Sequence, residues 1–244
     1  MSFSESEHEE SFNNLPIYLH NIRRNNPHTY THIKTDVMDH FQACLWLLDL
    51  HAFIGCLLSV IFIGSVCLRG EYLNTMFVAV AIDGNNQIVP IQFSLAMENI
   101  IDCCTCFIMK LREALREGRE LLFISNVNDV VSSCIGHVFP DFYHGYTCKS
   151  VFMYICIRVC GNRTLEPFVL DDIQIIYNQN FHRLTNDARE VLINIGHEKW
   201  ARSYVPNIRS NVINMDIPQF LLVLSVNQRN VPIITFAEAI RDYI

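Results

Sequence analysis

Residues 59–93 read SVIFIGSVCLRGEYLNTMFVAVAIDGNNQIVPIQF, and this stretch decides the fold. It holds three apolar runs rich in β-branched residues, a composition typical of buried strands. The runs are residues 59–66, 73–82 and 87–93. Gly70 and Glu71 allow a turn after the first run, and the Asp-Gly-Asn-Asn tetrad at 83–86 tolerates positive φ and marks a hairpin. The stretch therefore predicts three consecutive antiparallel strands.

Helical and strand patterns alternate after this hairpin. Apolar residues recur every three or four positions across 98–117, which predicts an amphipathic helix that ends before Gly118. Residues 121–125 predict a short strand, 127–138 a second helix and 141–147 a fifth strand. The predicted order, β-β-β-α-β-α-β, is that of a ribonuclease-H-like core, an α/β fold built on a mixed sheet.

The flanking segments complete the predicted organisation. Glutamates among serines predict a disordered acidic tail, and the next segment carries a helical pattern at 15–24 and an extended one at 28–35. The four regions are the tail at 1–14, a helical and extended lead-in at 15–58, the core at 59–150 and a helical completion at 151–244. Additional C-terminal helices are expected at 171–177, 181–195 and 232–243.

The composition excludes a disordered chain and argues against autonomous, tight nucleic-acid binding. The chain has 244 residues, 50% of them hydrophobic, and a formal net charge of -7. Tight binding to nucleic acid draws most of its affinity from Lys and Arg that neutralise phosphates. The ten cysteines lie mostly in apolar runs, so buried reduced thiols in a nuclear or cytoplasmic protein are expected.

One cysteine and histidine cluster resembles a metal site. Cys134, His137, His144 and Cys148 follow one another closely, but their spacing matches no standard zinc module. Core thiols explain the cysteines better.

A membrane span is the alternative interpretation of one apolar run. Residues 52–68 carry no charge over 17 positions, the lower edge for a spanning helix, which usually takes ~20 apolar residues. A buried helix end followed by a buried strand explains the same run.

Several longer motifs point to one family. They are LPIYLHNIRRNNP at 15–27, DGNNQIVPI at 83–91, VFPD at 138–141, HGY at 144–146 and EKWAR at 198–202. These motifs resemble, in the same order, the catalytic domain of plant Mutator-like element (MULE) transposases. The resemblance covers most of the chain and implies a ribonuclease-H-like fold that cuts and rejoins DNA at transposon ends. It also implies an Asp-Asp-Glu triad, because paired Mg²⁺ or Mn²⁺ ions need anionic oxygen ligands.

The chain departs from the family at all three triad positions. The aligned residues are Gly64, Asn126 and Gln219. The family's Cys and His are also replaced, by Thr147 and Ser150. Neutral amides are poor ligands for Mg²⁺. We therefore expect no metal cofactor and a catalytically inactive domain, either a transposon-derived remnant or a protein kept for binding DNA or a partner.

Two nearby acids offer an alternative, an active transposase that uses displaced carboxylates. Asp129 lies three residues after Asn126, and Asp216 three before Gln219. Three residues correspond to ~4.5 Å of helical rise, whereas Mg²⁺ binds oxygen at ~2.1 Å. Helix-start positions explain both acids, and Pro218 is expected to bend the helix that would present Gln219.

The remaining candidates have structural explanations. Arg112, Arg202 and Arg209 are weak candidates for phosphate contacts, although scattered arginines on an acidic protein usually form a solvated face. Trp200 is expected to pack on the core and His144 to bond to backbone at a strand end. DNA is the partner that the resemblance implies, and no small-molecule ligand is expected.

Overall fold

The computed structural model describes residues 4–48, 57–68, 75–85, 87–97, 100–115, 121–147, 150–151, 154–155, 158, 186–200 and 231–243. It is an α/β structure whose helices pack on a mixed seven-stranded sheet. The strands are β1 (Tyr30–Thr35), β2 (Phe41–Leu47), β3 (Leu57–Cys67), β4 (Thr75–Asp83), β5 (Ile88–Ala96), β6 (Leu122–Ser125) and β7 (Tyr143–Tyr146). The helices are α1 (Glu5–Asn25), α2 (Ile100–Ala114), α3 (Asp129–Val138), α6 (Asn186–Ile195), the 3-10 helix η2 (His197–Lys199) and α8 (Ile233–Tyr243).

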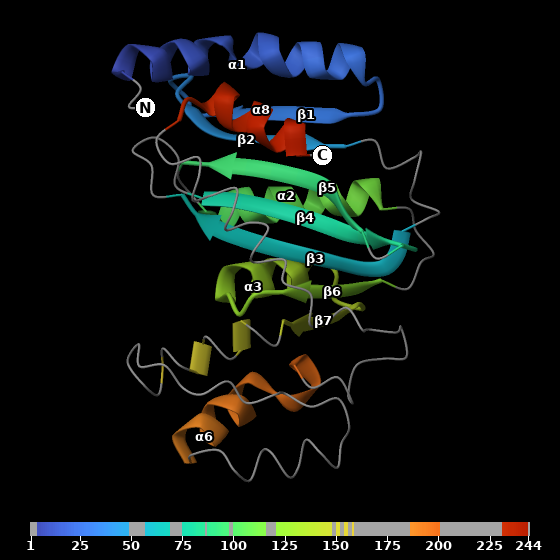
Figure 1. Cartoon of the computed structure of the whole chain (residues 1–244). Helices are drawn as coiled ribbons and strands as arrows, with labels where there is room; N and C mark the ends of the chain where they lie inside the picture. Colours follow the sequence, from blue (N-terminus) through green and yellow to red (C-terminus); the bar gives the residue numbers. More distant parts are fainter. Residues whose placement is uncertain are drawn as a thin grey trace.

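The sheet has the spatial order β1-β2-β5-β4-β3-β6-β7, which runs down the view in Figure 1. As predicted, β3, β4 and β5 are consecutive and antiparallel. β6 pairs with β3 in parallel, and β7 pairs with β6 in parallel. The predicted chain order of strands and helices from β3 to β7 is confirmed.

Helices cover both faces of the sheet, which explains why most positions of the central strands are apolar. In β3, Val60 and Phe62 face a core formed with α1 and α8. Ile61 and Ile63 face a second core formed with α2 and α3. Successive side chains of a strand point to opposite faces, so a strand buried on both sides shows no polar alternation. Each such side chain contributes ~1.5–3 kcal/mol by burial.

The disordered tail expected at residues 1–14 is wrong from Glu5 onward, because α1 begins there. The Glu7 carboxylate accepts hydrogen bonds from the Ser4 N–H (2.7 Å) and the Ser4 hydroxyl (2.9 Å). Acidic residues in a first turn also interact favourably with the helix dipole. Ser11 accepts a bond from the Ile234 N–H at 3.0 Å, which connects α1 to α8.

The helix end expected at the start of the run 52–68 lies outside the described residues, and Phe41–Leu47, ahead of that run, forms the strand β2, which was not predicted. This strand pairs with β1 on one side and β5 on the other, and residues 43–47 are buried. A short, continuous apolar run has no visible period, so only the neighbouring strands decide its structure.

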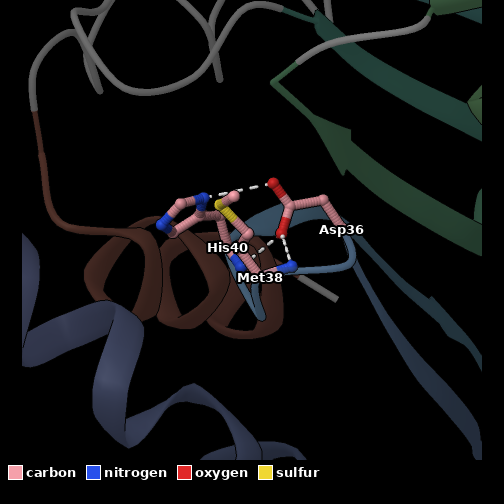
Figure 2. Close-up of polar contacts among 3 residues, drawn as sticks. All are labelled: Asp36, Met38 and His40. Atoms are coloured by element: carbon pink, nitrogen blue, oxygen red, sulfur yellow. Dashed lines mark hydrogen bonds and ion pairs between the residues drawn. The ribbon is translucent and has the colours of Figure 1, made fainter.

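A tight hairpin turn joins β1 and β2. The Asp36 carboxylate accepts hydrogen bonds from the backbone N–H of Met38 (2.8 Å) and of His40 (2.9 Å), as Figure 2 shows. It also lies 3.1 Å from Nδ1 of His40. Asp39 takes a positive φ of 62°, a conformation that Asp tolerates better than most residues.

The alternative of a membrane span at 52–68 requires a long apolar helix. No helix within the described ranges is both long and apolar enough to span a bilayer. In the run at 52–68, Leu57–Cys67 is β3, which pairs with β4 and β6.

Candidate functional site

The structure brings two of the aligned triad positions together. Strands β3 and β6 are parallel neighbours in which Ile63 pairs with Ser125. Gly64 is the next residue of β3, and Asn126 directly follows the last residue of β6, so positions far apart in the sequence occupy adjacent places. Gly64 is buried and Asn126 is half-buried. In open α/β sheets, binding sites form at the carboxyl ends of parallel strands.

The residues at these two positions do not fit a pair of divalent cations. Gly64 has no side chain, and Asn126 offers a neutral amide, whereas Mg²⁺ sites depend on carboxylates. Gln219 and Asp216 lie outside the described residues, as does Pro218. Over the part of the chain that the structure describes, no three His, Cys, Asp or Glu side chains are arranged to hold a metal.

Neutral hydrogen bonds connect the strand ends beside this position. The Asn128 side chain is the N-cap of α3, and its Oδ1 accepts bonds from Val130 N–H (3.0 Å) and Val131 N–H (3.1 Å). Its Nδ2 donates to Ser65 Oγ at 3.2 Å, which connects β3 to the start of α3. Asn128 is therefore the residue that positions the first turn of α3.

Asp129 follows directly in that first turn. Its side chain is exposed, and it lines a cavity of about 330 Å³ together with Tyr146 and Arg158. An exposed acid at a helix start is favoured by the helix dipole.

His144 is buried and bonded to a side chain, so the expected bond to backbone is wrong. Its Nε2 lies 2.9 Å from the hydroxyl of Ser125, the last residue of β6. The Ser125 hydroxyl also donates to the Asn126 carbonyl at 2.8 Å. Because a hydroxyl has one proton, Nε2–H of His144 is then the donor toward Ser125. A histidine in that tautomer does not act as a base toward the serine.

Burial holds this histidine neutral. Desolvation, with a further contribution from the Lys199 charge, lowers the pKa of His144 to about 4. The Ser125–His144 pair therefore has the character of a structural connection between β6 and β7 rather than of a nucleophile and its base.

Two of the family-like motifs pack against each other. The Tyr143 hydroxyl donates to the Glu198 carbonyl. A Cβ built on Gly145 would lie 2.8 Å from the Lys199 carbonyl oxygen, so only glycine permits this approach of η2 to β7. Trp200 is buried, as predicted, and its indole N–H donates to the Leu192 carbonyl at 3.4 Å. These motif residues have packing roles.

Of the three candidate arginines, Arg112 lies among the described residues and makes contacts within the chain. Arg112 donates to the Val138 carbonyl, and its guanidinium lies 5.7 Å from the Phe139 ring centroid, so it connects α2 to the end of α3. Arg202 and Arg209 lie outside the described residues.

The prediction of buried thiols is confirmed for four of the six described cysteines, whereas Cys67 is exposed and Cys106 is half-buried. Cys134 is a buried free thiol whose Sγ lies 3.4 Å from Thr105 Oγ1, at the contact between α2 and α3. Cys44, Cys103 and Cys104 are also buried free thiols. Cys148 lies outside the described residues.

No protein-family model and no curated protein matches the chain. The connection to MULE transposases thus depends on the motifs quoted above. Three residues of the cavity beside Asp129 were not singled out from the sequence, namely Tyr154, Arg158 and Asn194. Tyr154 and Arg158 lie four residues apart and Asn194 belongs to α6, and the three form no linear motif, so no sequence signal was available for them.

Proposed function

We propose that this chain is a MULE transposase-derived domain with a ribonuclease-H-like core, whose DNA-cleaving centre has been replaced by neutral residues. The observation that carries the proposal is the adjacency of Gly64 and Asn126 at the ends of parallel strands. The resemblance places these two positions in stretches that are far apart in the sequence, residues 64–70 and 123–126. The chain order β-β-β-α-β-α-β supports the same core.

Loss of the triad charges is compatible with a stable fold. Two carboxylates on adjacent strands repel each other unless a cation lies between them. Gly64 and Asn126 remove that repulsion, and the nearby bond from Asn128 to Ser65 is uncharged. The domain then remains folded without metal, and its proposed role is binding to DNA or to a partner protein.

Calorimetry with Mg²⁺ and Mn²⁺ tests the proposal. The triple variant Gly64→Asp, Asn126→Asp, Gln219→Glu is expected to bind two ions at least about tenfold more tightly than the natural chain. Since Gly64 is buried in β3, the double variant Asn126→Asp, Gln219→Glu serves as a second measurement that leaves β3 unchanged. Equal binding by the natural chain and both variants would contradict the alignment of the site.

A nicking assay distinguishes the alternative with displaced acids. The natural chain is expected to leave supercoiled DNA intact in Mn²⁺. Nicking that disappears in Asp129→Asn or Asp216→Asn would show that the centre is active and would overturn the proposed loss of activity.

A further inference from the structure

A cavity of about 330 Å³ lies beside the carboxyl ends of β6 and β7 and reaches α6. Tyr146, at the end of β7, forms one wall, and Val191 and Ile195 of α6 form another. The volume lies at the lower end of the range for small-molecule sites, which corresponds to one small ligand rather than a duplex.

The walls of this cavity are fixed by contacts within the chain. The Tyr146 hydroxyl lies 3.0 Å from Ser132 Oγ, and its ring makes an edge contact with His144 at 5.2 Å between centroids. The Arg158 guanidinium lies 5.2 Å from the ring centroid of Tyr154. A cation held over an aromatic ring loses less freedom when it binds an anion, which favours binding.

The polar groups of the cavity carry opposite charges. Arg158 offers a cation with fixed donors, and Asp129 offers an acceptor. Asn194 adds an amide that both donates and accepts. The N-terminus of α3 does not serve as the anion site, because Asn128 already accepts from its first-turn N–H groups.

The geometry points to a binding site for a single nucleotide. Arg158 holds the phosphate, the aromatic and aliphatic walls contact the base, and Asp129 and Asn194 bond to its polar edge. Each group has the chemistry that the corresponding part of a nucleotide requires. The site departs from the expectation that no small molecule binds. We infer that the nucleotide is the unpaired end of a DNA strand. This source, but not the nucleotide site itself, rests on the proposed function.

The acceptor at Asp129 sets a preference among bases. Carboxylates accept from the cytosine amino group, and Asn pairs with the adenine edge, whereas thymine presents carbonyl oxygens beside its one N–H. Cytosine and adenine nucleotides are therefore expected to bind more tightly than thymine nucleotides, by about threefold or more.

Titration of the full chain with dCMP, dAMP, dTMP and inorganic phosphate, followed by NMR or calorimetry, tests the site. Arg158→Ala is expected to weaken dCMP binding about tenfold, and Asp129→Ala to remove the preference for dCMP over dTMP. These side chains are exposed, so the variants are expected to fold. Arg23→Ala is the matched control, since Arg23 is an exposed arginine on α1 and does not line the cavity. It is expected to bind dCMP as the natural chain does.

Three outcomes would overturn the site. They are no dCMP binding, an equal loss in Arg158→Ala and Arg23→Ala, or inorganic phosphate binding as tightly as dCMP.

The source is tested separately, with a blunt duplex and a duplex that carries a 5′-phosphorylated single-stranded end. Preference for the tailed duplex, lost in Arg158→Ala, supports the strand end. Binding of dCMP without that preference retains the cavity as a mononucleotide site and counts against the proposed DNA role. Tailed DNA that binds equally to the natural chain and Arg158→Ala supports the DNA role and contradicts the site.

Discussion

The hydroxyl of Ser125 lies 2.9 Å from Nε2 of His144, and both side chains are buried. Ser125 ends β6 and His144 belongs to β7, the parallel edge of the sheet. This pair connects β6, which Asn126 directly follows, to β7, which contacts η2. The edge of the sheet nearest the candidate site therefore depends on a histidine that must remain neutral.

Acid is expected to weaken this edge. The pKa of His144 is about 4 in the folded chain because of burial and the Lys199 charge, against an ordinary value of 6.5. Below pH 6.5 the unfolded chain binds a proton that the folded chain does not, so stability falls from about pH 6.5 toward pH 4. The loss approaches about 3 kcal/mol. Urea unfolding at several pH values measures it.

The control for this prediction is His144→Gln. Glutamine retains a donor toward Ser125 but does not titrate, so the pH dependence of its free energy of unfolding should be shallower than that of the natural chain. Parallel curves for the two proteins between pH 7 and pH 4 would show that His144 does not cause the acid sensitivity.

Gly145→Ala is expected to reduce the free energy of unfolding by about 1–3 kcal/mol, because overpacking forces backbone to move. The added methyl would lie 2.8 Å from the Lys199 carbonyl oxygen and 3.0 Å from the Tyr143 ring. Gly136→Ala is the matched control, since a Cβ there meets nothing within 4 Å and Gly136 lies inside α3. That variant should gain about 0.5–1 kcal/mol. A loss of stability at both positions would contradict the close approach of η2 to β7.

The N-cap of α3 gives a third prediction. Asn128→Ala removes the acceptor for Val130 and Val131 N–H and is expected to cost about 1 kcal/mol of unfolding free energy. Asn128→Asp keeps that acceptor but loses the donor to Ser65. If the cap dominates, chemical denaturation will show Asn128→Asp to be the more stable variant, whereas equal losses would assign the effect to the bond with Ser65.

The central fold was readable from the sequence because each of its signals is local. The runs that became β3, β4 and β5 are apolar and β-branched, and the tetrad after Ile82 marks their hairpin. The patterns of α2 and α3 have the helical period on one face. Tertiary partners decided the two elements that were missed. The acidic start of α1 reads as disordered until Glu7 bonds to Ser4, and β2 shows its type only between β1 and β5.

The candidate site was readable in part for a related reason. Gly64 and Asn126 were found because the resemblance aligns residues 64–70 and 123–126 with the family, and strand pairing then places them together. Ser125, the partner of His144, was not found from the sequence, because it lies in another strand and no spacing rule connects the two residues. The cavity residues Arg158 and Asn194 are similar cases, since they line one cavity but lie far apart in the sequence.

The hairpin turn in Figure 2 gives the last prediction, because one carboxylate holds it. Hydrogen bonds from the backbone of His40 and, after it, of Met38 lower the pKa of Asp36 below its ordinary 3.8. Asp36→Ala is therefore expected to lower Tm at pH 7 and to shift the backbone amide resonances of both donors. A depressed carboxyl pKa stabilises the fold above the ordinary value and loses that effect as pH falls through the folded value. The Tm difference between Asp36→Ala and the natural chain should thus shrink toward pH 2.

Asp39→Asn is the matched control, since it removes one charge from the same turn and keeps a residue that tolerates positive φ. If both variants lower Tm equally, the charge of the turn matters and the bonds to Asp36 do not.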